Sequence, residues 1–142
     1  MFSKEESRVL RQEFWTSFGK SFPRKWLLYN TKLKGLDFKF HFDTKRAFVA
    51  LDLDEPLENR IRFWEKLLAL KSILQDDYLP EAVFEESYVL ENGKEISRIY
   101  VPLEKKVSIH NKNTWQEVMV FFSEKMSLFE AFFQEYRDVI DS

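Results

Sequence analysis

Every second residue is apolar along residues 36–42 and again along residues 47–53, and this period constrains the fold more than any other feature of the chain. The polar pair Thr44-Lys45 separates the two segments. Because successive side chains of a strand point to opposite faces, a turn at this pair places all eight apolar residues on one face. The pattern therefore predicts an antiparallel hairpin with one buried side. Its predicted pairs are Phe42 with Ala47, Phe40 with Val49, Phe38 with Leu51 and Leu36 with Leu53.

Three other segments repeat their apolar residues at helical spacing and predict three helices. A Ser-x-x-Glu capping box opens the first, over residues 4–19. Asp54-Glu55-Pro56 supplies a cap, an early acid and a first-turn proline for the second, which ends near residue 75. Its apolar stripe includes Leu57, Ile61, Trp64 and Leu68. The third helix, over residues 115–140, is apolar over about half its circumference, which is typical of a helix with two neighbours.

A second hairpin is predicted around Asn92-Gly93, a dipeptide preferred in two-residue turns because both positions tolerate positive φ. A turn of that kind sets Val89 opposite Ile96. Residues 107–109 are a plausible short fifth strand. The order helix, hairpin, helix, hairpin, strand, helix predicts an α+β fold in which three helices pack on an antiparallel sheet, with residues 1–142 as a single domain.

The composition excludes several classes of chemistry. With no cysteine, the chain has no disulfide, thiolate metal site or thiol nucleophile. His41 and His110 are its only histidines, which argues against a histidine-dominated metal centre, and no cofactor is expected. The first residues are acidic and no stretch has about 18 uncharged apolar residues, so we expect a cytoplasmic protein without a membrane partner.

Charge is balanced over the whole chain, at a formal −2, but it is segregated. Residues 20–46 hold eight cations and two acids, whereas residues 52–91 hold four cations and eleven acids. Cations interleaved with aromatic residues are typical of surfaces that bind single-stranded nucleic acid. The alternative is that the two regions are solvated faces or pair with each other. The candidates for contact with nucleic acid or with a partner protein are Arg24, Lys25, Trp26, Tyr29, Lys32 and Lys34.

Asp37 and Asp52 face each other on the polar side of the predicted first hairpin, with Lys39, His41 and Asp43 beside them. Two facing carboxylates repel each other unless a cation or a proton lies between them. They are therefore the candidates for a divalent metal or for an acid/base pair. The alternative is an exposed end of the ribbon that Lys39 and water neutralise, and under that interpretation the chain has no metal site.

No recognisable active-site motif accompanies these features, since the three glycines stand alone and neither histidine has a catalytic neighbour. The sequence therefore favours a non-enzymatic binding module that contacts a partner protein or a second copy of itself. Nucleic-acid binding by residues 20–46 is the alternative function, and a metal-dependent hydrolase using Asp37 and Asp52 is a third. The adjoining apolar stripe of the last helix supplies the candidates for an oligomer interface, which are Phe121, Leu128, Phe132 and Val139.

Five aromatic-rich stretches also occur in a recognisable order, at residues 14–18, 25–31, 38–43, 93–100 and 108–115. In that order they resemble a prokaryotic family of uncharacterised domains. Members of that family stand alone or follow a nuclease domain of the restriction-endonuclease type. The resemblance covers almost the whole chain, but its motifs are structural and bring no catalytic residues. It implies an accessory or interaction module with nucleic-acid processing as its context.

Overall fold

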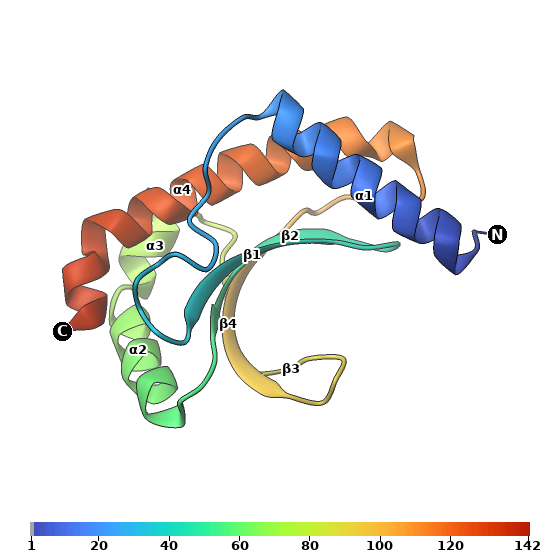
Figure 1. The fold of residues 1–142 in the computed structure, drawn as a ribbon. Coiled ribbons are helices and arrows are strands. Elements are labelled where there is room, and N and C mark those ends of the chain that lie inside the picture. The colour runs from blue at the N-terminus through green and yellow to red at the C-terminus, as the bar shows by residue number, and fades with distance from the viewer. Residues whose placement is uncertain (1) are drawn as a thin grey trace.

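A four-stranded antiparallel sheet, in the order β1-β2-β4-β3, forms the centre of the computed structural model, which describes residues 2–142. The helices lie along one face of the sheet, and the concave opposite face has no helix over it (Figure 1). The architecture confirms the predicted α+β class and the predicted order of helices and hairpins. None of the described helices is long and apolar enough to cross a lipid bilayer. In chain order the elements are α1 (Lys4–Ser21), β1 (Leu36–Phe42), β2 (Ala47–Leu53), α2 (Leu57–Ala69), α3 (Lys71–Asp77), β3 (Val83–Val89), β4 (Glu95–Pro102), a short 3-10 helix η1 (Lys112–Thr114) and α4 (Trp115–Asp141).

The first hairpin, β1 and β2, has the predicted register. All four predicted pairs occur, from Phe42 with Ala47 to Leu36 with Leu53. Strand β2 is buried along its whole length because β1 and β4 flank it in the sheet. A period of two with one apolar face leaves a strand only one register that buries that face, which is why the pairing was predictable.

The second hairpin, β3 and β4, differs from the prediction by one residue. Val89 pairs with Glu95 rather than with Ile96. The loop holds three residues, because the Leu90 N–H donates to the Lys94 carbonyl at 2.8 Å. Gly93 closes this loop at φ +86°, a left-handed conformation that three-residue hairpin loops commonly place at their last position. A second irregularity, a bulge between Glu85 and Tyr88, interrupts the ladder further along.

Two further segments differ from the expected elements. Residues 107–109 do not form a fifth strand but cross beside the turn of the first hairpin as a loop, where the Ile109 N–H donates to the Asp43 carbonyl at 3.0 Å. A single backbone hydrogen bond holds the loop in place but does not make a strand pairing. The predicted second helix is divided into α2 and α3 at Leu70. It begins only after Pro56, and Asp54 pairs with Lys94 instead of capping it.

The core is an aromatic cluster between the sheet and the helices. Phe38 of β1 lies against Phe129 and Phe133 of α4, with ring centroids 5.4 and 5.5 Å apart. Phe14 of α1 meets Phe122 of α4 edge to face at 6.1 Å. Each such buried ring contributes about 1.5–3 kcal/mol through the removal of apolar surface from water. The 15 phenylalanines of the chain therefore serve mainly to join the sheet to α1 and α4.

Candidate functional site

The outer edge of β1 presents backbone groups that point away from the sheet. At the two ends of the hairpin the Asp54 N–H donates to the Gly35 carbonyl at 2.8 Å, and the Asp43 N–H donates to the Arg46 carbonyl at 3.0 Å. Hydrogen-bonded pairs recur at every second residue of an antiparallel ladder, so residues 35, 37, 39, 41 and 43 turn their peptide groups toward β2. The peptide groups of Leu36, Phe38, Phe40 and Phe42 therefore point outward.

A connector, residues 22–35, covers the first part of this edge. The Leu36 N–H donates to the Leu33 carbonyl at 3.2 Å, and the Phe38 N–H donates to the Leu28 carbonyl at 3.0 Å. The hydroxyl of buried Thr31 donates to the Leu36 carbonyl at 2.6 Å. Beyond Phe38 the connector makes no backbone hydrogen bond to this edge.

The second part of the edge is open. The outward peptide groups of Phe40 and Phe42 make no hydrogen bond to any other residue from 2 to 142. An unpaired strand edge of this kind is a template for the main chain of another segment. It is the one place in the first hairpin where the ladder could continue.

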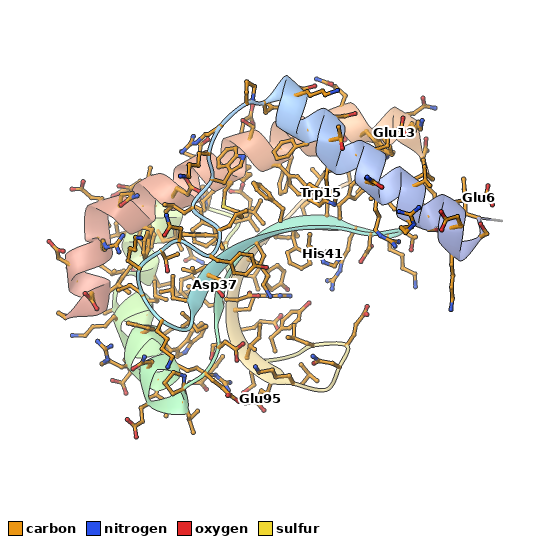
Figure 2. All side chains as sticks on the ribbon, viewed as in Figure 1. Glu6, Glu13, Trp15, Asp37, His41 and Glu95 are labelled. Carbon is orange, nitrogen blue, oxygen red and sulfur yellow. The ribbon has the colours of Figure 1, made fainter. Side chains whose placement is uncertain are left out.

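A groove of about 320 Å³ lies beside the open positions, and we call it the edge groove. Tyr29 of the connector is 73% exposed at its rim. Trp15 of α1 is held more firmly, because its ring stacks on Phe122 at 5.8 Å with an interplanar angle of 4°. Figure 2 shows Trp15 between α1 and the first hairpin. The residues that line the edge groove are Trp15, Leu28, Tyr29, Phe38, Lys39 and Phe40.

Two of the predicted contact residues are used to hold the connector in place. Arg24 donates to Glu130 of α4 at 3.0 Å and lies 4.4 Å from the centre of the Trp26 ring. Trp26 in turn packs edge to face on Phe40 at 5.5 Å. Glu130 is buried and also accepts the Leu27 N–H at 2.8 Å. Trp26 is thus packed against the body of the domain, whereas Arg24 stays exposed while Glu130 holds its guanidinium.

The other four predicted contact residues remain at the surface. Lys25, Lys32 and Lys34 are exposed, and none forms an ion pair within the part of the chain that the structure describes. The connector contains no acid at all. These lysines give the connector, whose Tyr29 lines the edge groove, a positive charge that no acid of the connector balances.

The predicted pairing of Asp37 with Asp52 is present on the concave face. Asp52 is buried and accepts two hydrogen bonds from Arg98, from Nε at 2.7 Å and from Nη2 at 2.9 Å, while the Lys39 ammonium lies 3.4 Å away. Its oxygens are therefore occupied by cations of this chain. No group of three or more possible metal ligands gathers anywhere in residues 2–142. No pattern in the sequence predicted the pairing of Asp52 with Arg98, because it depends on a strand pairing across 46 positions.

Burial and charge act differently on the two aspartates of β1 and its turn. Burial raises the pKa of Asp37, and the carboxylates of Asp52 and Asp54 add to that effect against the opposing charge of Lys39. Asp43 is also partly buried, but its hydrogen bonds from His41 and from backbone N–H groups outweigh burial and lower its pKa. Asp37 thus ionises less readily than Asp43.

The other polar side chains described on the concave face bond to one another. His41 lies flat on Phe48 at 4.4 Å and bonds to Asp43 at 2.6 Å. Arg46 donates to the Tyr88 hydroxyl at 3.0 Å and covers the Phe48 ring at 5.0 Å. Figure 2 shows His41 and Asp37 along the same strand of this face. The arrangement is a network of paired charges over an aromatic ring rather than a set of groups aimed at a ligand.

The candidate oligomer residues of α4 divide into two pairs. Phe121 and Phe132 are buried within the chain, the latter against Tyr78 at 5.5 Å. Leu128 and Val139 are exposed. Half of the stripe is therefore already covered by intramolecular packing.

Comparison with known proteins gives a family but no activity. A family model described as a domain of unknown function (DUF4268) matches residues 10–137. This range is nearly the whole chain, so the chain belongs to that family, and the expected likeness to a family of uncharacterised domains is confirmed. The chain matches no curated protein and no solved structure.

Proposed function

We propose that this member of the DUF4268 family is a non-enzymatic interaction module that binds an extended acidic segment of a partner protein. The segment adds to the sheet as a further strand along the open edge of β1. The observation that carries the proposal is the pair of unpartnered outward peptide groups, at Phe40 and Phe42, beside the edge groove. Strand addition of this kind obtains affinity from main-chain bonds and specificity from pockets for alternate side chains.

The geometry supports a definite mode of contact. A residue of the incoming strand exchanges two main-chain hydrogen bonds with Phe40, each contributing about 0.5–1.5 kcal/mol. Residues that face each other across a ladder point to the same side of the sheet, so the side chain of this residue lies on the helix side, as that of Phe40 does, and both of its neighbours point to the concave face. On the helix side it enters the edge groove between Trp15 and Tyr29, where an apolar or aromatic side chain is buried. Rigid aromatic walls of this kind supply most of the binding energy in many interfaces.

The positive charge of the connector favours an acidic ligand segment. Lys25, Lys32 and Lys34 have no acid partner in residues 2–142, and Lys39 lines the edge groove with its side chain partly exposed. Acidic side chains of the ligand neutralise these lysines, and salt weakens that attraction. Nucleic acid is the alternative anion, but it has no peptide groups to pair with those of Phe40 and Phe42. The open edge therefore favours a protein ligand.

The setting of the proposed activity follows from the resemblance and the composition. The implied prokaryotic origin and nuclease context support a partner that takes part in nucleic-acid processing. The absence of cysteine supports action in a reducing compartment such as the cytoplasm.

The experiment uses a short capped peptide in which glutamate alternates with valine and phenylalanine. We expect it to bind the full chain and to slow hydrogen exchange at the Phe40 and Phe42 amides. The triple variant Lys25→Glu, Lys32→Glu and Lys34→Glu should weaken binding at least about tenfold, because it reverses the charge of the connector that carries Tyr29 of the edge groove. The matched control is Lys4→Glu, Arg11→Glu and Lys106→Glu, which reverses three exposed cations outside the connector.

Three results contradict the proposal. One is that the peptide fails to bind the wild-type protein at millimolar concentration. Another is that the control weakens binding as much as the triple variant does. The third is that labelled single- or double-stranded oligonucleotides bind at low salt while the peptide does not, which would establish the nucleic-acid alternative.

A further inference from the structure

A second groove lies at the edge of the sheet opposite to β1, between α2 and the β3–β4 hairpin, and we call it the α2 groove. Its volume is about 320 Å³. One wall is an apolar stripe of α2, in which Leu57, Ile61 and Leu68 are 59%, 52% and 43% exposed. Of the apolar stripe predicted for this helix, Leu57, Ile61 and Leu68 lie at the surface, whereas Trp64 is buried. Figure 2 shows Glu95, from the other wall, at the end of the molecule that is remote from Trp15.

Trp64 lies in the lining of this groove and lacks a hydrogen-bond acceptor. The side chain is only 4% exposed, and its indole Nε1 is the single buried side-chain nitrogen or oxygen of residues 2–142 without a partner. A buried indole N–H usually finds an acceptor, because desolvating it without one is costly. The Trp64 N–H therefore has no acceptor within residues 2–142, and its nitrogen is closed off from solvent in this structure.

Arg60 makes the far wall of the groove rigid. It donates to the Ser97 hydroxyl at 2.9 Å, to the Glu86 carbonyl at 3.0 Å and to the Glu95 carboxylate at 3.0 Å. The Glu86 carbonyl also accepts from the Ser97 hydroxyl at 2.6 Å, beside the bulge in β3. These bonds use the hydrogens of Nε and Nη2, so Arg60 holds the wall in place.

The charge that remains in the α2 groove is negative. Glu65 of α2 and Glu86 of β3 line it from opposite sides, and neither forms an ion pair in the described chain. They belong to residues 52–91, where eleven acids outnumber four cations. An anionic ligand is therefore disfavoured, and a cationic one is attracted.

We propose that the α2 groove binds an extended basic segment of a protein. A large apolar side chain of the segment packs on Leu57, Ile61 and Leu68. After a local side-chain adjustment, a main-chain carbonyl of the segment accepts the Trp64 N–H. Lysine or arginine side chains flanking the apolar residue pair with Glu65 and Glu86. An extended segment fits better than a helix, because most carbonyl groups of a helix are already bonded within it. The site is independent of the edge groove, which lies on other elements and carries the opposite charge.

The test uses a short capped peptide of alternating lysine and leucine carrying a fluorescent label, with binding followed by anisotropy. We expect Ile61→Lys to weaken binding at least tenfold, since it removes an apolar contact and adds a like charge. Ile61 is half exposed, so the variant should fold. The matched control Val9→Lys changes a similarly exposed apolar residue of α1 and should bind as the wild type does. Trp64→Phe keeps a ring but removes the donor and should weaken binding about fivefold.

Four results would overturn the inference. The first is that the wild-type protein does not bind the peptide at millimolar concentration, and the second is that Ile61→Lys binds it equally well. The third is that a peptide with glutamate in place of lysine binds equally well. The fourth is that the protein self-associates and Ile61→Lys abolishes the association, which would make a second copy the occupant. The variant with Lys25, Lys32 and Lys34 changed to glutamate should still bind this peptide. A failure at one groove is therefore distinguishable from a failure at the other.

Discussion

Arg98 of β4 donates two hydrogen bonds to Asp52 of β2, of 2.7 and 2.9 Å. Both residues lie on the face of the sheet that no helix covers. Both side chains are nevertheless buried. The rings of Tyr88 and Phe48 account for this burial on the arginine side, since the guanidinium carbon lies 4.3 and 5.0 Å from their centres. The concave face thus has a small polar core of its own.

Breaking this pair should destabilise the fold. We expect Arg98→Met to lower the free energy of unfolding by about 3–5 kcal/mol, because it leaves the buried Asp52 carboxylate with only the more distant Lys39 ammonium, at 3.4 Å. Urea denaturation followed by circular dichroism measures the change. The double variant Arg98→Met with Asp52→Leu removes both charges and should recover part of the loss. A single variant as stable as the wild type would show that the pair is solvated in solution.

The two aspartates around β1 should affect stability with opposite dependence on pH. The raised pKa of Asp37 means that the fold favours its protonated form, so its stabilising effect is present at low pH and disappears as the pH rises through that pKa. The lowered pKa of Asp43 means that its contribution is present at neutral pH and disappears as the pH falls through that pKa. Denaturation of Asp37→Asn and Asp43→Asn between pH 3 and 7 tests this. On raising the pH, Asp37→Asn should gain stability relative to the wild type and Asp43→Asn should lose it. Parallel curves would refute the assignment.

Glu130 should fix the connector to α4. Its carboxylate accepts both from Arg24 and from the Leu27 N–H, inside a buried site. We expect Glu130→Gln to cost about 1–3 kcal/mol, since one buried donor is left with a weaker partner. Hydrogen exchange should accelerate at the Leu27 and Phe38 amides while the β2–β4 ladder stays protected. Equal acceleration throughout the sheet would instead indicate global destabilisation.

Gly35 and Gly93 should respond differently to alanine. Both have a left-handed backbone, at φ +85° and +86°. A Cβ at Gly35 would lie 2.5 Å from the Glu55 carbonyl oxygen, whereas nothing lies within 4 Å of one at Gly93. Gly93→Ala should therefore cost only the conformational penalty of about 1–2 kcal/mol. Gly35→Ala adds an overpacking cost of about 1–3 kcal/mol. Thermal denaturation compares the two, and equal losses would contradict the close approach.

Self-association through α4 rests on the two exposed candidates. Leu128 and Val139 alone offer little apolar area, because Phe121 and Phe132 are buried. We expect sedimentation equilibrium to give a monomer at micromolar concentration. A dimer that Leu128→Glu and Val139→Glu dissociate would restore the interface that the sequence pattern suggested.

The sequence predicted elements best where one physical rule decided them. The first hairpin has a single apolar face and a short polar turn, so its register followed from the period alone. The second hairpin is partly apolar on both faces, so nothing in its pattern opposed a shift by one residue, and the αL position of Gly93 decided the register.

The candidate sites were only partly predictable for a different reason. Trp26 packs on Phe40 and exposed Arg24 pairs with Glu130, and these contacts depend on distant parts of the chain. Tyr29 and three lysines of the connector lie at the surface without such contacts. The α2 groove was missed because its signal is the unpartnered N–H of Trp64, which exists only once α2 and the second hairpin are packed together.

The place of helix α4 in the sequence affects how the chain folds during its synthesis. It follows all four strands in the sequence, yet its phenylalanines cover the apolar face of the first hairpin. On the ribosome the hairpin therefore emerges before the α4 rings that pack on Phe38, and Phe38 lacks these rings until the 27 residues of α4 have been translated. Nascent chains with such exposed strands are prone to aggregate. A ribosome stalled before Trp115 should consequently present a chain that general chaperones retain, and release should coincide with the synthesis of α4.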